Sequence, residues 1–155
     1  MQLVDHVRPD LVATDLRGRS VDEVLAELVA LPAAAGLVRD PEGLAAALLR
    51  RERVHSTALG QGVAVPHGLC GDLEDPVVIV GLSGPGVPFG EGEEPEPVRI
   101  VFLLLSPPAR SRSHIKLLAR IARLARQDAF LAALRACSTG EDVVEAIRAF
   151  EREHV

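Results

Sequence analysis

Aromatic residues are scarce in this 155-residue sequence, which contains four Phe and no Tyr or Trp. Aliphatic and Ala side chains must therefore fill the core. A net charge of −5 and the lack of stacking platforms argue against a general nucleic-acid binder. Lys is almost missing too: Lys116 stands beside sixteen Arg, a bias that a GC-rich genome can produce.

Long apolar runs and a cysteine framework are also lacking. No stretch of about 18 apolar residues predicts a membrane-spanning helix, and the N-terminus has neither the basic nor the hydrophobic region of a signal peptide. Two Cys, at positions 70 and 137, are too few to staple a secreted mini-domain. We expect one globular domain over residues 1–155, cytoplasmic and without insertion into a membrane.

The first half of the chain predicts helices that follow an edge strand. A short apolar run at 11–16 is typical of such a strand, and a capping box from Ser20 to Glu23 opens a helix that ends near Gly36. Asp40 and Pro41 start a second helix, which runs to about Arg53. The glycines of residues 56–62 then indicate a loop.

The second half predicts the centre of the sheet and three more helices. Strands are expected at 63–65, where Pro66 ends the strand, at 76–83 and at 98–105, with the Gly/Pro/Glu-rich stretch 84–97 as a connecting loop. A helix capped by Ser111 or Ser113 follows, then one over 127–136, and a last one after a capping box from Ser138 to Glu141. The order β-α-α-β-β-β-α-α-α predicts an α/β fold, a three-layer α/β/α sandwich around a small mixed sheet.

His67 is the most unusual residue for chemistry. It lies between Pro66 and Gly68, so a rigid strand end presents its imidazole in a glycine-bounded segment. There it could serve as an acid, a base, a metal ligand or a phosphoryl acceptor, or be an ordinary surface histidine.

His114 and Arg51 lie on predicted helices. His114 heads an apolar stripe, so its ring should point inward near a helix N-terminus that attracts anions; the alternative is a core histidine satisfied by backbone. Arg51 lies in a charged helix end, where the helix dipole alone favours it. The opposite side of the His114 helix predicts a basic face, either solvated or a partner surface, formed by Arg112, Lys116, Arg120 and Arg123.

Several familiar motifs are incomplete. Gly60 and Gly62 begin a dinucleotide fingerprint that fails at Val65, and no P-loop sequence occurs. His67 and Cys70 have metal-ligand spacing, but no second ligand pair accompanies them, and no third group marks Cys70 as a nucleophile. We therefore expect neither a cofactor nor a metal, and interpret Cys70 as a small apolar filler.

The segment from Arg51-Glu52 through Ser56-Thr57 and Gly60-Gln-Gly62 to Pro66-His67-Gly68 resembles a known signature. It is similar to the IIA phosphocarrier of the fructose/mannitol/nitrogen type, the EIIA type 2 domain of the bacterial phosphotransferase system. His114-Ile-Lys-Leu-Leu-Ala119 is similar to the second motif of this family. The likeness extends from about residue 3 to residue 150, and Gln61 differs from the Asn or Glu of many relatives.

The resemblance implies roles for the candidate residues. His67 would accept a phosphoryl group from an HPr-like donor, His114 would stabilise that group, and Arg51 would help to hold it. Ser56, Thr57 and Gly68 would form its surroundings. Positioning and charge stabilisation are the main tasks of a protein in phosphoryl transfer, and these residue types suit them.

The resemblance leaves the biological role open. In one interpretation, the chain passes the phosphoryl group to a IIB partner in fructose- or mannitol-type sugar uptake. In another, it is a nitrogen-type regulator whose phosphorylation state controls binding to target proteins. A third is a non-phosphorylated binding module on the same fold, against which the presence of both His67 and His114 counts. Whether the chain forms a homodimer is left open as well.

Overall fold

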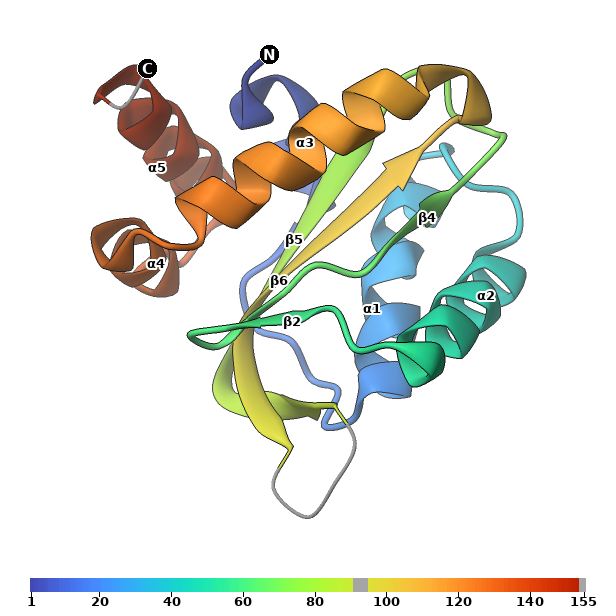
Figure 1. Ribbon diagram of the computed structural model, residues 1–155, viewed down its shortest axis with the longest axis horizontal. Coiled ribbons are helices and arrows are strands. Elements are labelled where there is room, and N and C mark those ends of the chain that lie inside the picture. Colours follow the sequence, from blue (N-terminus) through green and yellow to red (C-terminus); the bar gives the residue numbers. More distant parts are fainter. Residues whose placement is uncertain (91–94, 154–155) are drawn as a thin grey trace.

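A mixed β-sheet lies at the centre of the computed structural model, which describes residues 1–90 and 95–153 (Figure 1). Within these residues its strand order is β1-β5-β6-β3-β2, with β4 also paired to β6. Strands β5 and β6 are antiparallel, whereas β1 is parallel to β5 and both β3 and β4 are parallel to β6. The strand bounds are β1 Val12–Ala13, β2 Ala58–Gly60, β3 Val63–Ala64, β4 His67–Leu69, β5 Val77–Phe89 and β6 Glu96–Ser106.

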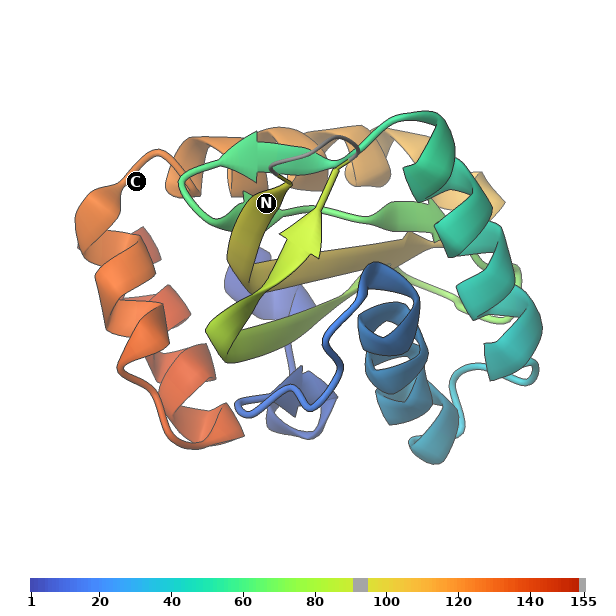
Figure 2. The same cartoon turned by 90° about the horizontal axis from the view of Figure 1, so that it is seen from below.

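Helices cover both faces of this sheet (Figure 2). Val78 and Val80 of β5 pack into the core beneath α3, α4 and α5, while the intervening Ile79 packs into the core beneath α1 and α2. This alternation places one apolar set on each face, and it confirms the predicted three-layer α/β/α class. The helix bounds are α1 Val21–Ala34, α2 Pro41–Val54, α3 Ser111–Leu124, α4 Asp128–Arg135 and α5 Gly140–Glu153.

Two of the predicted helix starts are confirmed. The Ser20 hydroxyl accepts from the Glu23 amide at 3.4 Å, and the Asp40 carboxylate accepts from the Gly43 amide at 3.0 Å, with Pro41 as the first helical residue. Each cap satisfies one amide that the first turn of a helix leaves without a partner.

The other two predicted caps are wrong. No side chain caps α3, because the 3-10 turn η3, Pro108–Arg110, leads directly into it and Ser111 is already helical. At α5 the cap is one residue later than predicted, since the Thr139 hydroxyl accepts from the Asp142 amide at 3.0 Å. The capping residue is therefore Thr139 rather than Ser138, and the Asp142 carboxylate accepts from the Ser138 amide at 3.4 Å.

The strand predicted to end at Pro66 continues beyond it. Val63 pairs with Ile100 on β6, and His67 pairs with Leu104 in the same register, so β3 and β4 are two parts of one interrupted strand. Proline removes an amide donor but keeps its carbonyl. The Pro66 carbonyl accepts from the Leu104 amide at 3.0 Å, and this contact holds the strand in place across the gap.

Two predicted loops also contain strands. Within 56–62, β2 pairs with β3 across a turn in which Gly60, Gln61 and Gly62 all have positive φ, between 60° and 92°. Within 84–97, β5 extends to Phe89 and β6 begins at Glu96. Pairing resumes after a bulge because Gly86 adopts a φ of 87°, with its amide bound to the Ser83 hydroxyl. Residues 91–94 of this stretch lie outside the described residues.

The chain's first residues are tied to its last helix. The buried carboxylate of Glu151 in α5 accepts from the amides of Leu3 and Val4, both at 2.8 Å, at the 3-10 turn η1, Leu3–His6. Arg120 of α3 lies 3.2 Å from the same carboxylate. A second 3-10 turn, η2, spans Pro9–Leu11 and precedes β1. Glu151 therefore joins α3, α5 and the N-terminal turn.

Candidate functional site

The ring orientation of His67 is set by its own strand. Its Nδ1 lies 2.8 Å from the carbonyl oxygen of Val65, and a carbonyl can only accept a hydrogen bond. Nδ1 therefore carries the proton, and the Nε2 lone pair points away from the backbone. An Arg51 Nη2–H donates to this lone pair at 3.0 Å. The arrangement leaves a nucleophilic nitrogen beside a permanent positive charge.

Arg51 reaches His67 because α2 packs closely on β4. A Cβ added to Gly68 would come within 3.0 Å of the Leu48 side chain of α2, so glycine permits this approach. Gly68 was predicted among the phosphate surroundings; the structure places it at the packing contact between α2 and β4. Figure 1 shows β4 between α2 and α3.

His114 approaches the site from the first turn of α3. Its ring centroid lies 5.7 Å from that of His67, at an interplanar angle of 60°, and its Nδ1 is 2.7 Å from the hydroxyl of Ser106. Ser106 is the buried last residue of β6. The ring is half-buried, and its partner is a side-chain hydroxyl rather than the backbone partner of the core-histidine alternative.

Burial lowers the pKa of the His114 ring below its usual 6.5, and electrostatic interactions with His67 and Arg51 lower this pKa further. Below pH 6.5 the folded protein binds fewer protons at this ring than the unfolded chain does. The free energy of unfolding therefore decreases as the pH falls below 6.5. We expect the His114 ring signals to titrate below pH 6.5 in an NMR titration. A titration midpoint at or above 6.5 would contradict the burial argument.

Glu52 organises the segment that follows α2. Its buried carboxylate accepts from the amide of Thr57 at 2.6 Å and from the Thr57 hydroxyl at 2.7 Å. The predicted site residue Thr57 is thus committed to Glu52, while the Ser56 hydroxyl accepts from the Ala58 amide at 3.2 Å. Sequence reasoning did not single out Glu52 or Ser106. Charged helix ends are usually solvated, and a strand-end serine carries no signal of its own.

Two hollows flank His67. The first, which we call the arginine hollow, measures about 380 Å³, and the second, the apolar hollow, about 340 Å³. The arginine hollow is lined by Arg51, Val54, His55, Thr57 and His67. The apolar hollow is lined by His55, Ser56, Thr57, Ala58, Leu59, Val65, His67, Leu118 and Ala122. The site is therefore open on two sides, and apolar surface predominates in the lining of both hollows, with Arg51 as the charged residue of one of them.

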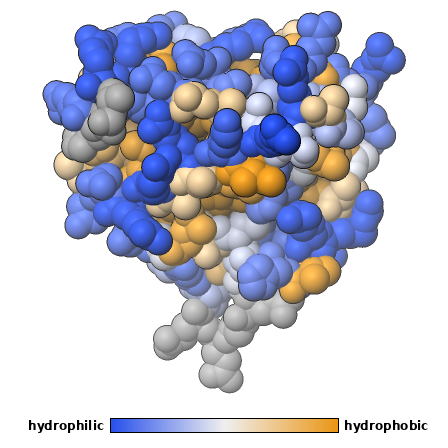
Figure 3. All heavy atoms as spheres, turned by 45° about the horizontal axis from the view of Figure 1, so that its top comes forward, coloured by the Kyte–Doolittle hydropathy of each residue, from blue (hydrophilic) through white to orange (hydrophobic). Residues whose placement is uncertain are grey.

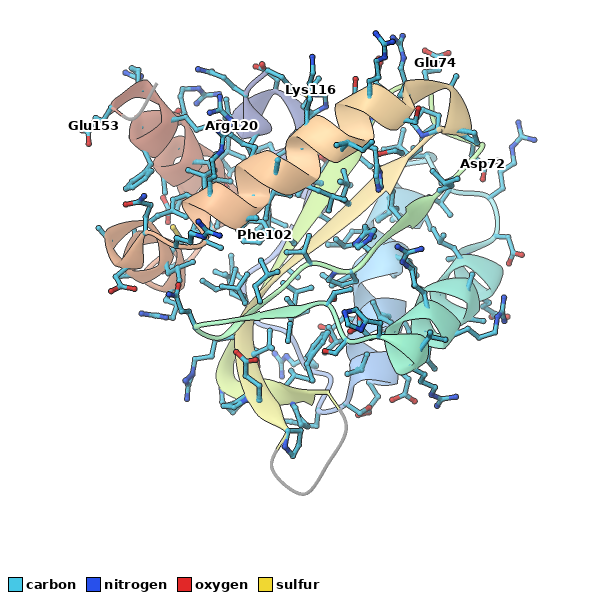
Figure 4. All side chains as sticks on the ribbon, in the orientation of Figure 1. Asp72, Glu74, Phe102, Lys116, Arg120 and Glu153 are labelled. Carbon is cyan, nitrogen blue, oxygen red and sulfur yellow. The ribbon has the colours of Figure 1, made fainter. Side chains whose placement is uncertain are left out.

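The predicted basic face of α3 is smaller than expected. Arg120 turns toward α5 and pairs with Glu151, whereas Lys116 is exposed on the outer side of the helix (Figure 4).

Cys70 is buried, with its amide bound to the Ser106 carbonyl at 2.8 Å, as expected for a small filler. Within residues 1–90 and 95–153, no three His, Cys, Asp or Glu side chains are grouped closely enough to hold a metal ion.

No helix in the described part of the chain combines the length and the apolar character needed to cross a bilayer.

The structure resembles solved IIA proteins throughout. It superposes on the crystal structure of the nitrogen regulatory protein IIA-Ntr from Neisseria meningitidis with a TM-score of 0.79 at 24% identity, covering 93% of this chain and 97% of that one. The mannitol IIA protein of Escherichia coli, solved in complex with phosphorylated IIB, gives a TM-score of 0.75 at 20% identity over 92% and 97% of the two chains.

Sequence comparison identifies relatives of two kinds. A nitrogen regulatory protein of Bradyrhizobium diazoefficiens is 34% identical over 147 residues, which cover 95% of both chains. The fructose-specific EIIABC component of Bacillus subtilis is 22% identical over 152 residues, and the chain spans 98% of its own length but 24% of that protein. Residues 5–149 match the family described as "Phosphoenolpyruvate-dependent sugar phosphotransferase system, EIIA 2". The chain therefore belongs to the EIIA type 2 family of the phosphotransferase system.

Proposed function

We propose that this protein is a phosphocarrier that accepts a phosphoryl group on Nε2 of His67 from an HPr-like donor and passes it to an acceptor protein. Members of its family act as phosphotransfer components. The observation that carries the proposal is the hydrogen bond from Nδ1 to the Val65 carbonyl, since it makes Nε2 the nitrogen with the lone pair. This lone pair becomes available for attack when the Arg51 N–H turns from it to the phosphoryl oxygens.

The transfer needs no proton movement at His67. The Nε2 lone pair forms a bond to phosphorus while the donor's nitrogen–phosphorus bond breaks and returns its electron pair to the donor imidazole. His67 then carries the phosphoryl group on Nε2, with Nδ1–H still bound to Val65. Only phosphorus changes partner, so the task of the protein is positioning and charge stabilisation.

Arg51 and His114 supply that stabilisation. The Arg51 guanidinium lies 3.0 Å from Nε2 and can turn its forked donors to the phosphoryl oxygens. The His114 ring faces His67 and is neutral before the anion arrives, because its pKa is lowered. A phosphoryl group on His67 favours protonation of His114 by its negative charge.

The surface around the two histidines suits protein donors and acceptors. Four large apolar side chains on the segments that carry the site are between 49% and 86% exposed. One lines the arginine hollow and one the apolar hollow, and the other two follow His67 and His114 closely in the chain. Figure 3, viewed from the side of α3, shows apolar patches between hydrophilic ones. These four residues are Val54, Leu59, Leu69 and Ile115. Clustered exposed apolar residues favour association with another protein.

Two kinds of acceptor fit the family. One is a IIB protein in sugar uptake, as in the mannitol IIA–IIB complex of the E. coli relative. The other is a regulated target protein, as suggested by the nitrogen regulatory relative, which is 34% identical over 147 residues. Transfer of label to a purified fructose- or mannitol-type IIB would instead support sugar uptake.

The proposal is tested by incubating the protein with phosphoenolpyruvate, Enzyme I and HPr. We expect one acid-labile phosphate per chain, with ¹⁵N and ³¹P NMR placing it on Nε2 of His67. Failure to take up label from a donor set that phosphorylates a known IIA protein would overturn the proposal.

For His114→Ala we expect onward transfer to slow by roughly 10- to 100-fold, because a group that stabilises developing charge is lost. The cost in folding should be limited to the unpaired Ser106 hydroxyl, about 1–3 kcal/mol. Single-turnover transfer and urea unfolding measure the two effects. His114→Gln, which retains a polar partner for Ser106, controls for the structural part. Unchanged transfer kinetics in His114→Ala would remove this role.

A further inference from the structure

His55 lies on the wall between the two hollows that flank His67. It follows α2 directly, and its amide donates to the Arg51 carbonyl at 3.2 Å, which fixes its backbone one turn from the arginine of the site. The Glu52–Thr57 hydrogen bonds hold the chain on its other side. The position of His55 is therefore as well defined as that of Arg51.

The side chain of His55 is available for a ligand. It lines both the arginine hollow and the apolar hollow, in each case together with His67. It is exposed, and its ring makes no hydrogen bond or ion pair with any residue that the structure describes. The sequence does not single out His55, because nothing in the spacing from position 55 to position 67 shows that both line the same hollows.

The charges around both hollows favour an anion. None of the lining residues of these two hollows is acidic. A third hollow that His55 lines, without His67, contains Asp22 and Glu52, and the Glu52 carboxylate already accepts from Thr57. Arg51 supplies a positive charge on one side. An imidazole always carries at least one N–H, so His55 can donate a hydrogen bond to an anion in either protonation state.

We propose that His55 is a third histidine of the phosphoryl site and donates a ring N–H to an oxygen of the phosphoryl group carried by His67. This inference rests on the proposed function and extends it to a residue outside the family-derived set. Arg51 and His55 would then bind the phosphoryl oxygens from the α2 side, while His114 approaches from α3. The hydrogen bond from His55 would lengthen the lifetime of the phosphoryl group on His67.

The test uses the full-length protein and potassium phosphoramidate, a small donor that phosphorylates imidazoles without a protein partner. The lifetime of phosphohistidine is followed by ³¹P NMR in the wild type, His55→Leu and His55→Gln. Leucine fills the space without a donor, and glutamine restores one. Arg50→Gln is the matched control, since Arg50 is an exposed cation of α2 that lines neither hollow.

We expect His55→Leu to lose its phosphate about three- to tenfold faster than the wild type, the net effect of one ordinary hydrogen bond in a solvated site. His55→Gln should recover most of the lifetime, and Arg50→Gln should match the wild type. The ring nitrogen signals of His55 should shift when His67 is phosphorylated.

The outcomes separate the two proposals. If His67 is phosphorylated in every variant with equal lifetimes and the His55 signals do not move, the role of His55 is wrong and the phosphocarrier function stands. If His55→Leu and Arg50→Gln lose phosphate equally fast, general charge explains the effect and His55 is again excluded. If His67 takes no phosphate from phosphoramidate or from HPr, the proposed function fails and the His55 role falls with it.

Discussion

The His67→Ala variant is expected to incorporate no phosphoryl group from phospho-HPr, a complete loss against one group per chain in the wild type. The reason is geometric: Nε2 of His67 is the ring nitrogen that Arg51 contacts, whereas His114 has its Nδ1 engaged with Ser106. Acid-labile label and intact-mass analysis measure the loss.

The same variant should remain folded. His67 is half-buried, and its removal deletes one local hydrogen bond to Val65, worth about 1 kcal/mol, and the exposed hydrogen bond from Arg51. Circular dichroism and urea unfolding check this point. Arg50→Gln, an exposed change on α2 away from both hollows, serves as the control and should be labelled like the wild type. Label that persists in His67→Ala would show that another residue is the acceptor.

The Glu52→Ala variant is expected to lose about 2–4 kcal/mol of unfolding free energy. The carboxylate accepts two short hydrogen bonds from Thr57, and its removal leaves a partly buried amide and hydroxyl without partners. The segment from His55 to Thr57, which lines both hollows, would lose its anchor. We therefore expect phosphorylation of His67 to slow as well, by a factor that labelling kinetics measure.

Two further variants sharpen the Glu52 prediction. Glu52→Gln retains one acceptor oxygen and should have an intermediate stability. Glu42→Ala removes an exposed carboxylate from the first turn of the same helix, where its interaction with the helix dipole is worth at most about 1 kcal/mol. If urea denaturation shows equal losses for Glu52→Ala and Glu42→Ala, the Thr57 hydrogen bonds contribute nothing to stability.

The layers of the fold could be predicted because the spacing of apolar residues shows which face of each helix or strand is buried. The short strands could not be predicted in this way. Glycine and proline mark residues 84–89 as a loop, yet Gly86 takes up the bulge and lets Val87 and Phe89 bury their side chains against α1 and α2. Pro66 likewise keeps its carbonyl in the sheet. Local composition indicates lost donors and flexibility, but the neighbouring strand decides the pairing.

The candidate site likewise contains residues that could be predicted from the sequence and residues that could not. Arg51, His67 and His114 could be proposed from the signature, and the structure brings the three together. Their supporting groups could not be proposed, because Glu52 and Ser106 act through contacts with Thr57 and His114 that only the folded chain creates. The place of Gly68 beside the phosphoryl group stays a prediction, and its missing side chain also accommodates Leu48 of α2.

The parallel pairing of β4 with β6 has a consequence for the newly synthesised chain. The position of His67 depends on Leu104, and that of His114 depends on Ser106, so neither histidine is in place until β6 has joined the sheet. Pairings between such distant segments form late, because closing the loop between them costs conformational entropy before the contacts of the sheet can stabilise the pairing. A nascent chain that ends before β6 would thus be inert to its donor, and competence for phosphorylation would report that synthesis and folding of the sheet are complete.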